Sequence, residues 1–196
     1  MKISEILNIP ISPFDESDDK LRRLFSFFLY SAPTIDSKSA AIIEESRLAK
    51  NWQEYISNFS NDSYSIIGAT CKIEAYFEKY KINDQSEINR RAKGFVCKRK
   101  DSNETDCKCV LRHIRNAIAH GHVYMCNAGN RKYILFEDFN KGGKQSSRML
   151  FSQSDLKKSY ASPSTSYLGS FKFPNSNSTL HLSAIRAVFE TASGAY

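Results

Sequence analysis

Arg115, Asn116 and His120 are the residues whose types best suit acid–base chemistry at a phosphate group. A histidine with an ordinary pKa of about 6.5 can accept or donate a proton at neutral pH. An arginine presents a planar fork of permanently charged donors that fits phosphate oxygens, and an asparagine carries both a donor and an acceptor. These residues belong to the run 110–121, which is rich in helix formers and stops at Gly121, as helices commonly do.

A helix over 110–119 sets the directions in which these side chains point. At about 100° per residue it has an apolar stripe and, opposite it, a polar face of His113, Asn116 and His120. Residues five apart point about 140° away from each other, so Arg115 and His120 cannot converge on one phosphate as a same-face pair. Either the helix distorts at its glycine end, or a second copy of the helix supplies half of the site. The plain alternative is that His120 is an ordinary surface histidine.

The R-x4-H spacing, with Asn116 directly after the arginine, resembles the signature of the HEPN superfamily (higher eukaryotes and prokaryotes nucleotide-binding). The longer order, R-N-A-I-A-H-G followed by a hairpin and a short helix, resembles a bacterial and plasmid-borne subgroup. The likeness covers roughly residues 60–160, of which 111–121 is the specific part. Many members of the superfamily are metal-independent ribonucleases.

The resemblance implies a role for each motif residue. His120 would be the acid or base, Arg115 the phosphate clamp and Asn116 the orienting residue, with Arg112 and His113 in support. HEPN proteins generally pair as homodimers in which the motif helices of both protomers line one cleft, which implies a composite active site. RNA carries its own nucleophile, the ribose 2′-hydroxyl, so cleavage would leave 2′,3′-cyclic phosphate ends without a metal.

The family resemblance also bears on two further positions, Glu74 and His122. HEPN folds often place an acidic residue on an earlier helix, facing the motif, and Glu74 is the candidate; it either pairs with Arg115 or is a solvated flank residue. Some HEPN toxins carry a tyrosine two residues after the motif histidine, where this chain has His122. We interpret His122 as the first residue of a strand, with a substrate contact as the alternative.

The chain has a formal net charge of +7, and its basic residues gather before the motif. Residues 90–115 hold nine basic and three acidic side chains. A basic segment that leads into the motif helix is a plausible footprint for an RNA backbone, although a solvated basic face is the commoner explanation. The RNA-binding candidates are Arg90, Arg91, Lys98, Arg99 and Lys100.

The five cysteines form no even framework, which suits a reducing cytoplasm. Cys107, Cys109, Cys97 and His113 lie near one another in the sequence but lack the spacing of a zinc knuckle, so we expect no metal and no other cofactor. We expect no secretion signal and no membrane-spanning segment, because no apolar run is long enough. The sequence therefore predicts a cytoplasmic protein.

For the fold we predict a mainly α, single HEPN-like domain over residues 1–196. It would be an antiparallel helical bundle with a small β-hairpin or three-stranded appendage after the motif helix. The expected parts are a helical core over about 17–121, a β-hairpin extension over about 122–152 and C-terminal helices over about 153–196. Within the core we predict helices over 15–30, 37–59, 63–81 and, as a shorter one, 84–99.

The leading functional expectation is a cytoplasmic, homodimeric, metal-independent endoribonuclease that takes RNA as its partner. A cellular role as a toxin with an antitoxin partner, or in defence against phage, rests on the family resemblance alone. The runner-up is a non-catalytic HEPN module that binds RNA or a nucleotide, or that serves in a larger complex. A third hypothesis is an interaction protein in which the motif is incidental, and it predicts neither binding nor cleavage of RNA.

Overall fold

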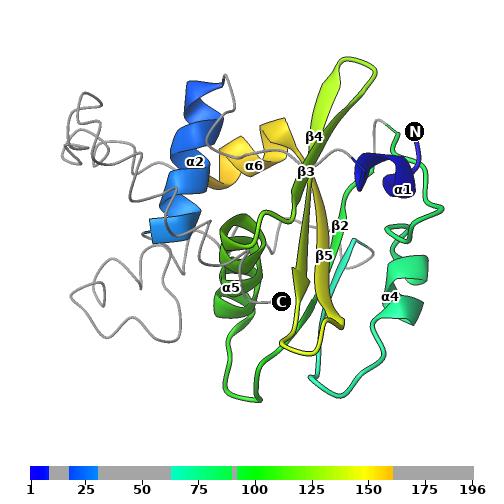
Figure 1. The fold of residues 1–196 in the computed structure, drawn as a ribbon, viewed down its shortest axis with the longest axis vertical. Coiled ribbons are helices and arrows are strands. Elements are labelled where there is room, and N and C mark those ends of the chain that lie inside the picture. The colour runs from blue at the N-terminus through cyan, green and yellow to red at the C-terminus, as the bar shows by residue number, and fades with distance from the viewer. Residues whose placement is uncertain (9–17, 31–62, 90–91, 161–196) are drawn as a thin grey trace. The chain divides into compact units, whose positions relative to one another are not determined.

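A computed structural model describes residues 1–8, 18–30, 63–89 and 92–160, and its centre is a five-stranded sheet (Figure 1). The strand order is β1-β2-β5-β4-β3. β1 (Tyr64–Ile67) runs parallel to β2 (Gly94–Lys98), and the other pairs are antiparallel: β2 with β5 (Gln145–Ser152), β5 with β4 (Arg131–Phe139), and β4 with β3 (Val123–Ala128). β5 therefore joins the β1-β2 pair to the β3-β4 hairpin.

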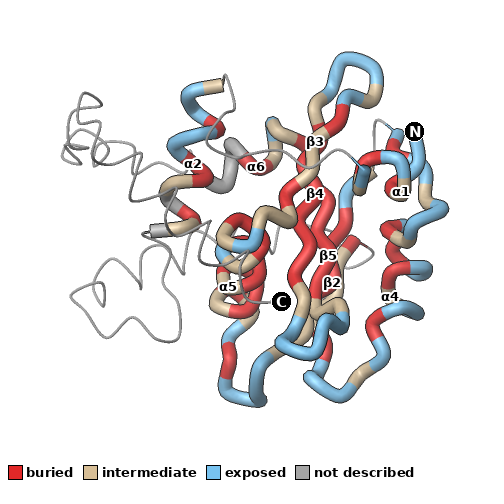
Figure 2. Tube along the Cα trace, in the orientation of Figure 1, coloured by how far each residue is buried: buried red, intermediate tan, exposed pale blue. Residues whose placement is uncertain are grey.

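Helices cover both faces of this sheet (Figure 1). One face carries α2 (Asp19–Tyr30), α5 (Asp106–Ala119) and α6 (Gln153–Tyr160); the other carries α1 (Ile3–Ile6) and α4 (Glu74–Lys79). Because successive strand residues point to opposite faces, Phe95 and Cys97 pack towards α5, while Val96 between them packs towards the other layer. Figure 2 shows the central strands buried along most of their length.

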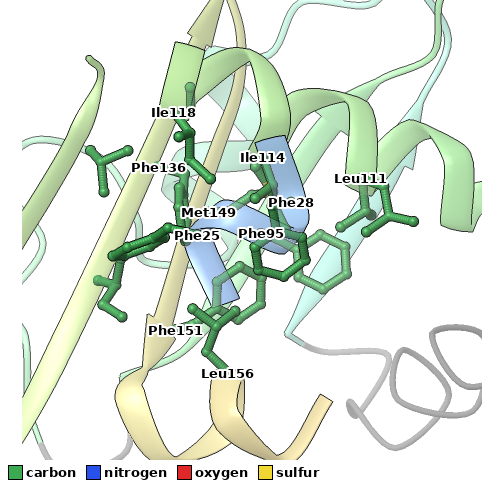
Figure 3. Packing of buried hydrophobic residues seen from close by; sticks show 14 of the residues in the cluster. Phe25, Phe28, Phe95, Leu111, Ile114, Ile118, Phe136, Met149, Phe151 and Leu156 are labelled. Carbon is green, nitrogen blue, oxygen red and sulfur yellow. The ribbon is translucent and has the colours of Figure 1, made fainter. Parts of the chain in front are cut away.

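The apolar stripe of helix α5 packs in one core with side chains of α2 and of the sheet (Figure 3). Leu111, Ile114 and Ile118 are fully buried, as are Phe25 and Phe28 of α2. Each such side chain contributes about 1.5–3 kcal/mol of transfer free energy when it leaves water. The apolar stripe predicted from the sequence is thus confirmed, and it fixes how α5 sits on the sheet.

The prediction of a mainly helical bundle is wrong, because the described residues build a mixed sheet with helices on both faces. The segment 84–99 was expected to be a helix, but its described residues are irregular over 84–89 and 92–93 and then form β2. The start of the expected helix 63–81 is β1. β2 is buried on both faces, so its sequence is a short continuous apolar run without alternation. Such a run does not distinguish a strand from a buried helical segment.

The elements after the motif helix follow the prediction more closely. The expected hairpin is β3-β4, the third strand is β5, and the short helix is α6. The expected helix 37–59 and the C-terminal part after residue 160 lie outside the described residues. The chain divides into two compact units, Met1–Tyr160 and Ala161–Tyr196, and only the first is described. None of the helices within the described ranges has both the length and the apolar character to cross a membrane.

Candidate active site

Helix α5 ends before Gly121 as its sequence predicts, but it begins at Asp106, earlier than the predicted start at residue 110. The side chain of the N-cap residue Thr105 accepts a hydrogen bond from the backbone N–H of Lys108 at 3.4 Å. At the other end Gly121 adopts φ +72°, and two reversed hydrogen bonds close the helix: the Gly121 N–H donates to Ile118 O and the His122 N–H to Ala117 O. This is a Schellman ending, which needs a residue in the left-handed region and favours glycine there. It fixes the backbone on both sides of Gly121.

Arg115 and His120 both project from this end of the helix into solvent. Among the residues that the structure describes, the Arg115 guanidinium has no ion-pair or hydrogen-bond partner. Its donors are therefore free to meet a phosphate. The helix stays regular as far as Ala119, and the His120 N–H still donates to Asn116 O at 2.9 Å. The helix thus does not unwind between Arg115 and His120 to bring them onto one face.

A hydrogen bond to the sheet orients the Asn116 side chain. Its Nδ2 donates to Asp138 Oδ2 on β4 at 3.1 Å. Asp138 is 2% exposed, and its other oxygen accepts the Phe139 N–H. Burial disfavours the Asp138 carboxylate, but the hydrogen bonds from His113 and Asn116 outweigh burial and lower its pKa. Asn116 therefore has a charged, fixed acceptor that sets its orientation.

His113 shares that acceptor and lies entirely inside the protein. Its Nδ1 lies 2.7 Å from Asp138 Oδ2, and its Nε2 lies 2.8 Å from Lys98 O. A carbonyl and a carboxylate both accept, so the ring donates from both nitrogens, which is the imidazolium form. Burial disfavours that charge, but the hydrogen bond to Asp138 outweighs burial and raises the pKa of His113. Both ring nitrogens of His113 therefore have hydrogen-bond partners inside the protein.

Arg112 is also engaged inside the protein. Its Nε and Nη2 donate to the two carboxylate oxygens of Glu104 at 2.6 and 2.9 Å, and Nη2 reaches Lys98 O as well. Burial disfavours the Glu104 carboxylate, but the bonds from Arg112 outweigh burial and lower its pKa. This pair ties the loop before α5 to the helix. Arg112 and His113 thus hold α5 in place from its sheet-facing side.

Of the two alternatives for Glu74, the pairing with Arg115 is not formed in this structure. Glu74 is exposed at the start of α4, on the opposite face of the sheet from α5. The reason is that residues 64–67 form a strand, so only a six-residue helix follows, and it packs on the far layer.

Comparison with known proteins identifies the family. The family model described as HEPN pEK499 p136 matches residues 34–170. The chain belongs to this HEPN family. No curated protein and no solved structure matches it. The matched range contains the motif helix of this HEPN chain and all five strands of the sheet, so the resemblance first drawn from residues 111–121 extends over most of the protein.

The RNA-binding candidates of the HEPN chain fall into three groups. Arg90 and Arg91 lie outside the described residues. Lys98 and Arg99 are half-buried at the end of β2, where the Arg99 guanidinium contacts Asp106 and the Glu104 carbonyl. Lys100 is exposed in the loop that leads to α5.

The cysteines of the HEPN chain are free thiols, and four of the five are buried. Cys97 and Cys109 contact each other between β2 and α5; this contact lowers the pKa of Cys109, and burial raises that of Cys97. Within residues 1–8, 18–30, 63–89 and 92–160, no group of three or more His, Cys, Asp or Glu side chains is arranged to hold a metal ion.

Two residues around the HEPN motif were not assigned a catalytic or positioning role from the sequence. Asp138 lies in β4, near the end of a mostly apolar strand. Only the packing of α5 on β4 shows that its carboxylate forms hydrogen bonds with Asn116 and His113. His122 was interpreted as the first residue of a strand, and it lies directly before β3. Its ring contacts those of His120 and Phe139, with the centroids 6.3 and 4.9 Å away.

Proposed function

We propose that this HEPN protein is a metal-independent endoribonuclease whose site is built on the C-terminal end of α5. The observation that carries the proposal is the pair of exposed motif side chains, Arg115 and His120, on a helix end that the sheet and the Gly121 turn hold rigidly. Arg112 and His113 of the same helix bind partners inside the protein, whereas Arg115 and His120 face solvent. A rigid support of this kind is what a catalytic group needs in order to act at a defined distance.

The chemistry follows from the properties of RNA. The ribose 2′-hydroxyl attacks the adjacent phosphorus, a new O2′–P bond forms and the P–O5′ bond breaks. His120 moves a proton at one of these two oxygens, and Arg115 stabilises the charge that develops on the phosphoryl oxygens. The products carry a 2′,3′-cyclic phosphate and a 5′-hydroxyl.

The site is completed between two copies of the chain. Because α5 stays regular up to His120, Arg115 and His120 point about 140° apart. In a two-fold dimer with adjacent α5 helices, Arg115 of one copy meets His120 of the other. Each dimer then holds two equivalent sites.

The test is cleavage of total cellular RNA in EDTA by the wild type, His120→Ala and Arg115→Ala. We expect cleavage by the wild type and a loss of at least about 10²-fold in each variant, because each removes a group that acts in the transition state. Arg23→Ala is the matched control, since Arg23 is an exposed arginine of α2 that pairs with Asp19 of the same helix. Mass spectrometry of the fragments identifies their ends.

Two results would reject this function. Full activity in both motif variants would remove Arg115 and His120 from the site. RNA binding by the wild type without any cleavage would indicate a non-catalytic HEPN module instead.

A further inference from the structure

A second histidine accompanies His120 at the end of α5. His120 and His122 flank Gly121, and their ring centroids are 6.3 Å apart. Backbone hydrogen bonds hold both positions. The His120 N–H donates to Asn116 O, the His122 N–H donates to Ala117 O, and the His122 carbonyl accepts the Glu137 N–H of β4 at 3.1 Å. Of the four histidines in the chain, these two lie together at the proposed site, while His113 is buried and His181 is outside the described residues.

The His122 ring is held by packing rather than by hydrogen bonds. The Phe139 ring meets it edge to face, with the centroids 4.9 Å apart and the planes at 76°. Nδ1 is buried and has no hydrogen-bond partner among the described residues; Nε2 is not among the buried unpaired atoms. A buried polar atom without a partner is uncommon in folded proteins, so the His122 ring is not placed there by its hydrogen bonds. Since no bond fixes the tautomer, Nε2 can present its lone pair to a ligand.

The charges around His122 favour a neutral ring. Burial and the neighbouring His120 lower its pKa below the ordinary value of 6.5, and the carboxylates of Glu137 and Asp138 on β4 oppose this only in part. A positive charge near an imidazole disfavours a second one on it, so His122 is the ring of this pair whose surroundings favour the neutral form. One acid and one base are what the cleavage of RNA requires.

We propose that His122 is the general base of the reaction and that His120 of the same chain is the general acid. This inference rests on the proposed ribonuclease function. His122 Nε2 takes the proton of the 2′-hydroxyl while O2′ bonds to phosphorus, and His120 gives its proton to O5′ as the P–O5′ bond breaks. One proton enters the pair and one leaves it, and exchange with water restores the starting state. A second copy of the chain then has to supply only Arg115.

The test is single-turnover cleavage of RNA in EDTA by the wild type, His120→Ala and His122→Phe from pH 5 to 9. Phenylalanine keeps the aromatic contact with Phe139 but cannot accept a proton. We expect His122→Phe to cleave roughly 10²- to 10⁴-fold more slowly, as is typical for loss of a general base, with unchanged RNA affinity. The wild-type rate should rise with pH around a midpoint below 6.5, and this rise should be absent in His122→Phe.

The possible results separate this inference from the proposed function. A purely structural role for His122 predicts that His122→Phe cleaves like the wild type with the same pH profile; that result, with His120→Ala inactive, overturns the inference alone. A rise with pH that persists in a slow His122→Phe also overturns it, because another group is then the base. No cleavage by the wild type overturns both.

Discussion

At the scale of single residues, Asp138 links the motif helix to the sheet. One of its oxygens accepts from both Asn116 and His113, so a single carboxylate orients a proposed site residue and neutralises a buried imidazolium. A substitution at this strand position therefore affects both the stability of the fold and the geometry of the site. Its partners come from α5, which is why the sequence around 138 gives no sign of the connection.

The His113–Asp138 pair predicts how stability depends on pH. The pKa of His113 is raised, so its contribution is complete below pH 6.5 and is lost as pH rises through the higher folded-state value. The pKa of Asp138 is lowered, so its contribution is present above pH 3.8 and is lost as pH falls through the lower folded-state value. We expect Asp138→Asn to lower the free energy of unfolding by about 3 kcal/mol near pH 6, as when a buried ion pair loses one partner.

Urea denaturation of both proteins between pH 5 and 9 measures this effect. The wild type should lose stability above pH 6.5 more steeply than Asp138→Asn, because only the wild type then loses the ion pair. Parallel curves for the two proteins would show that His113 is neutral in the folded state.

At the scale of elements, the Schellman ending of α5 places two proposed catalytic groups, one on each side of Gly121. Gly121→Ala puts a side chain at φ +72°, which costs about 1 kcal/mol although the space around it is open. Gly143 is a matched control, since it has φ +71° and equally open surroundings in the β4-β5 turn. We expect equal losses of stability in thermal denaturation, but slower RNA cleavage for Gly121→Ala alone. Equal cleavage rates would mean that the ending does not position the site.

The elements that the sequence predicted are those with strong local signals. Helix α5 has an apolar stripe and a terminal glycine, and the β3-β4 hairpin is marked by Gly129 and Asn130 in its turn. β1 and β2 were missed because they are four and five residues long and β2 is buried on both faces, so neither shows a period. The contact of His113 with the Lys98 carbonyl and the position of Glu74 depended on those strands and could not be predicted without them.

At the scale of the whole molecule, the proposed dimer predicts complementation. Arg115→Ala and His120→Ala are each expected to be inactive, but a mixed dimer holds one site with an intact Arg115 from one chain and an intact His120 from the other. After the two variants are mixed and allowed to exchange subunits, about a quarter of the wild-type activity per dimer should return. An inactive mixture, with exchange verified by mass spectrometry of tagged chains, would place Arg115 and His120 of each site in the same chain.

The position of β5 in the sheet has a consequence for how the protein folds during its synthesis on the ribosome. β5 is the middle strand, yet it is the last of the five in the chain, and it alone joins the β1-β2 pair to the β3-β4 hairpin. The motif helix is made before β5, so it emerges before the surface on which it packs has been completed. Pairing between distant segments is slow to form and has to wait for its last strand. During translation, Arg115 and His120 therefore leave the ribosome before the sheet that supports their helix is complete, while the chain is still close to ribosomal RNA.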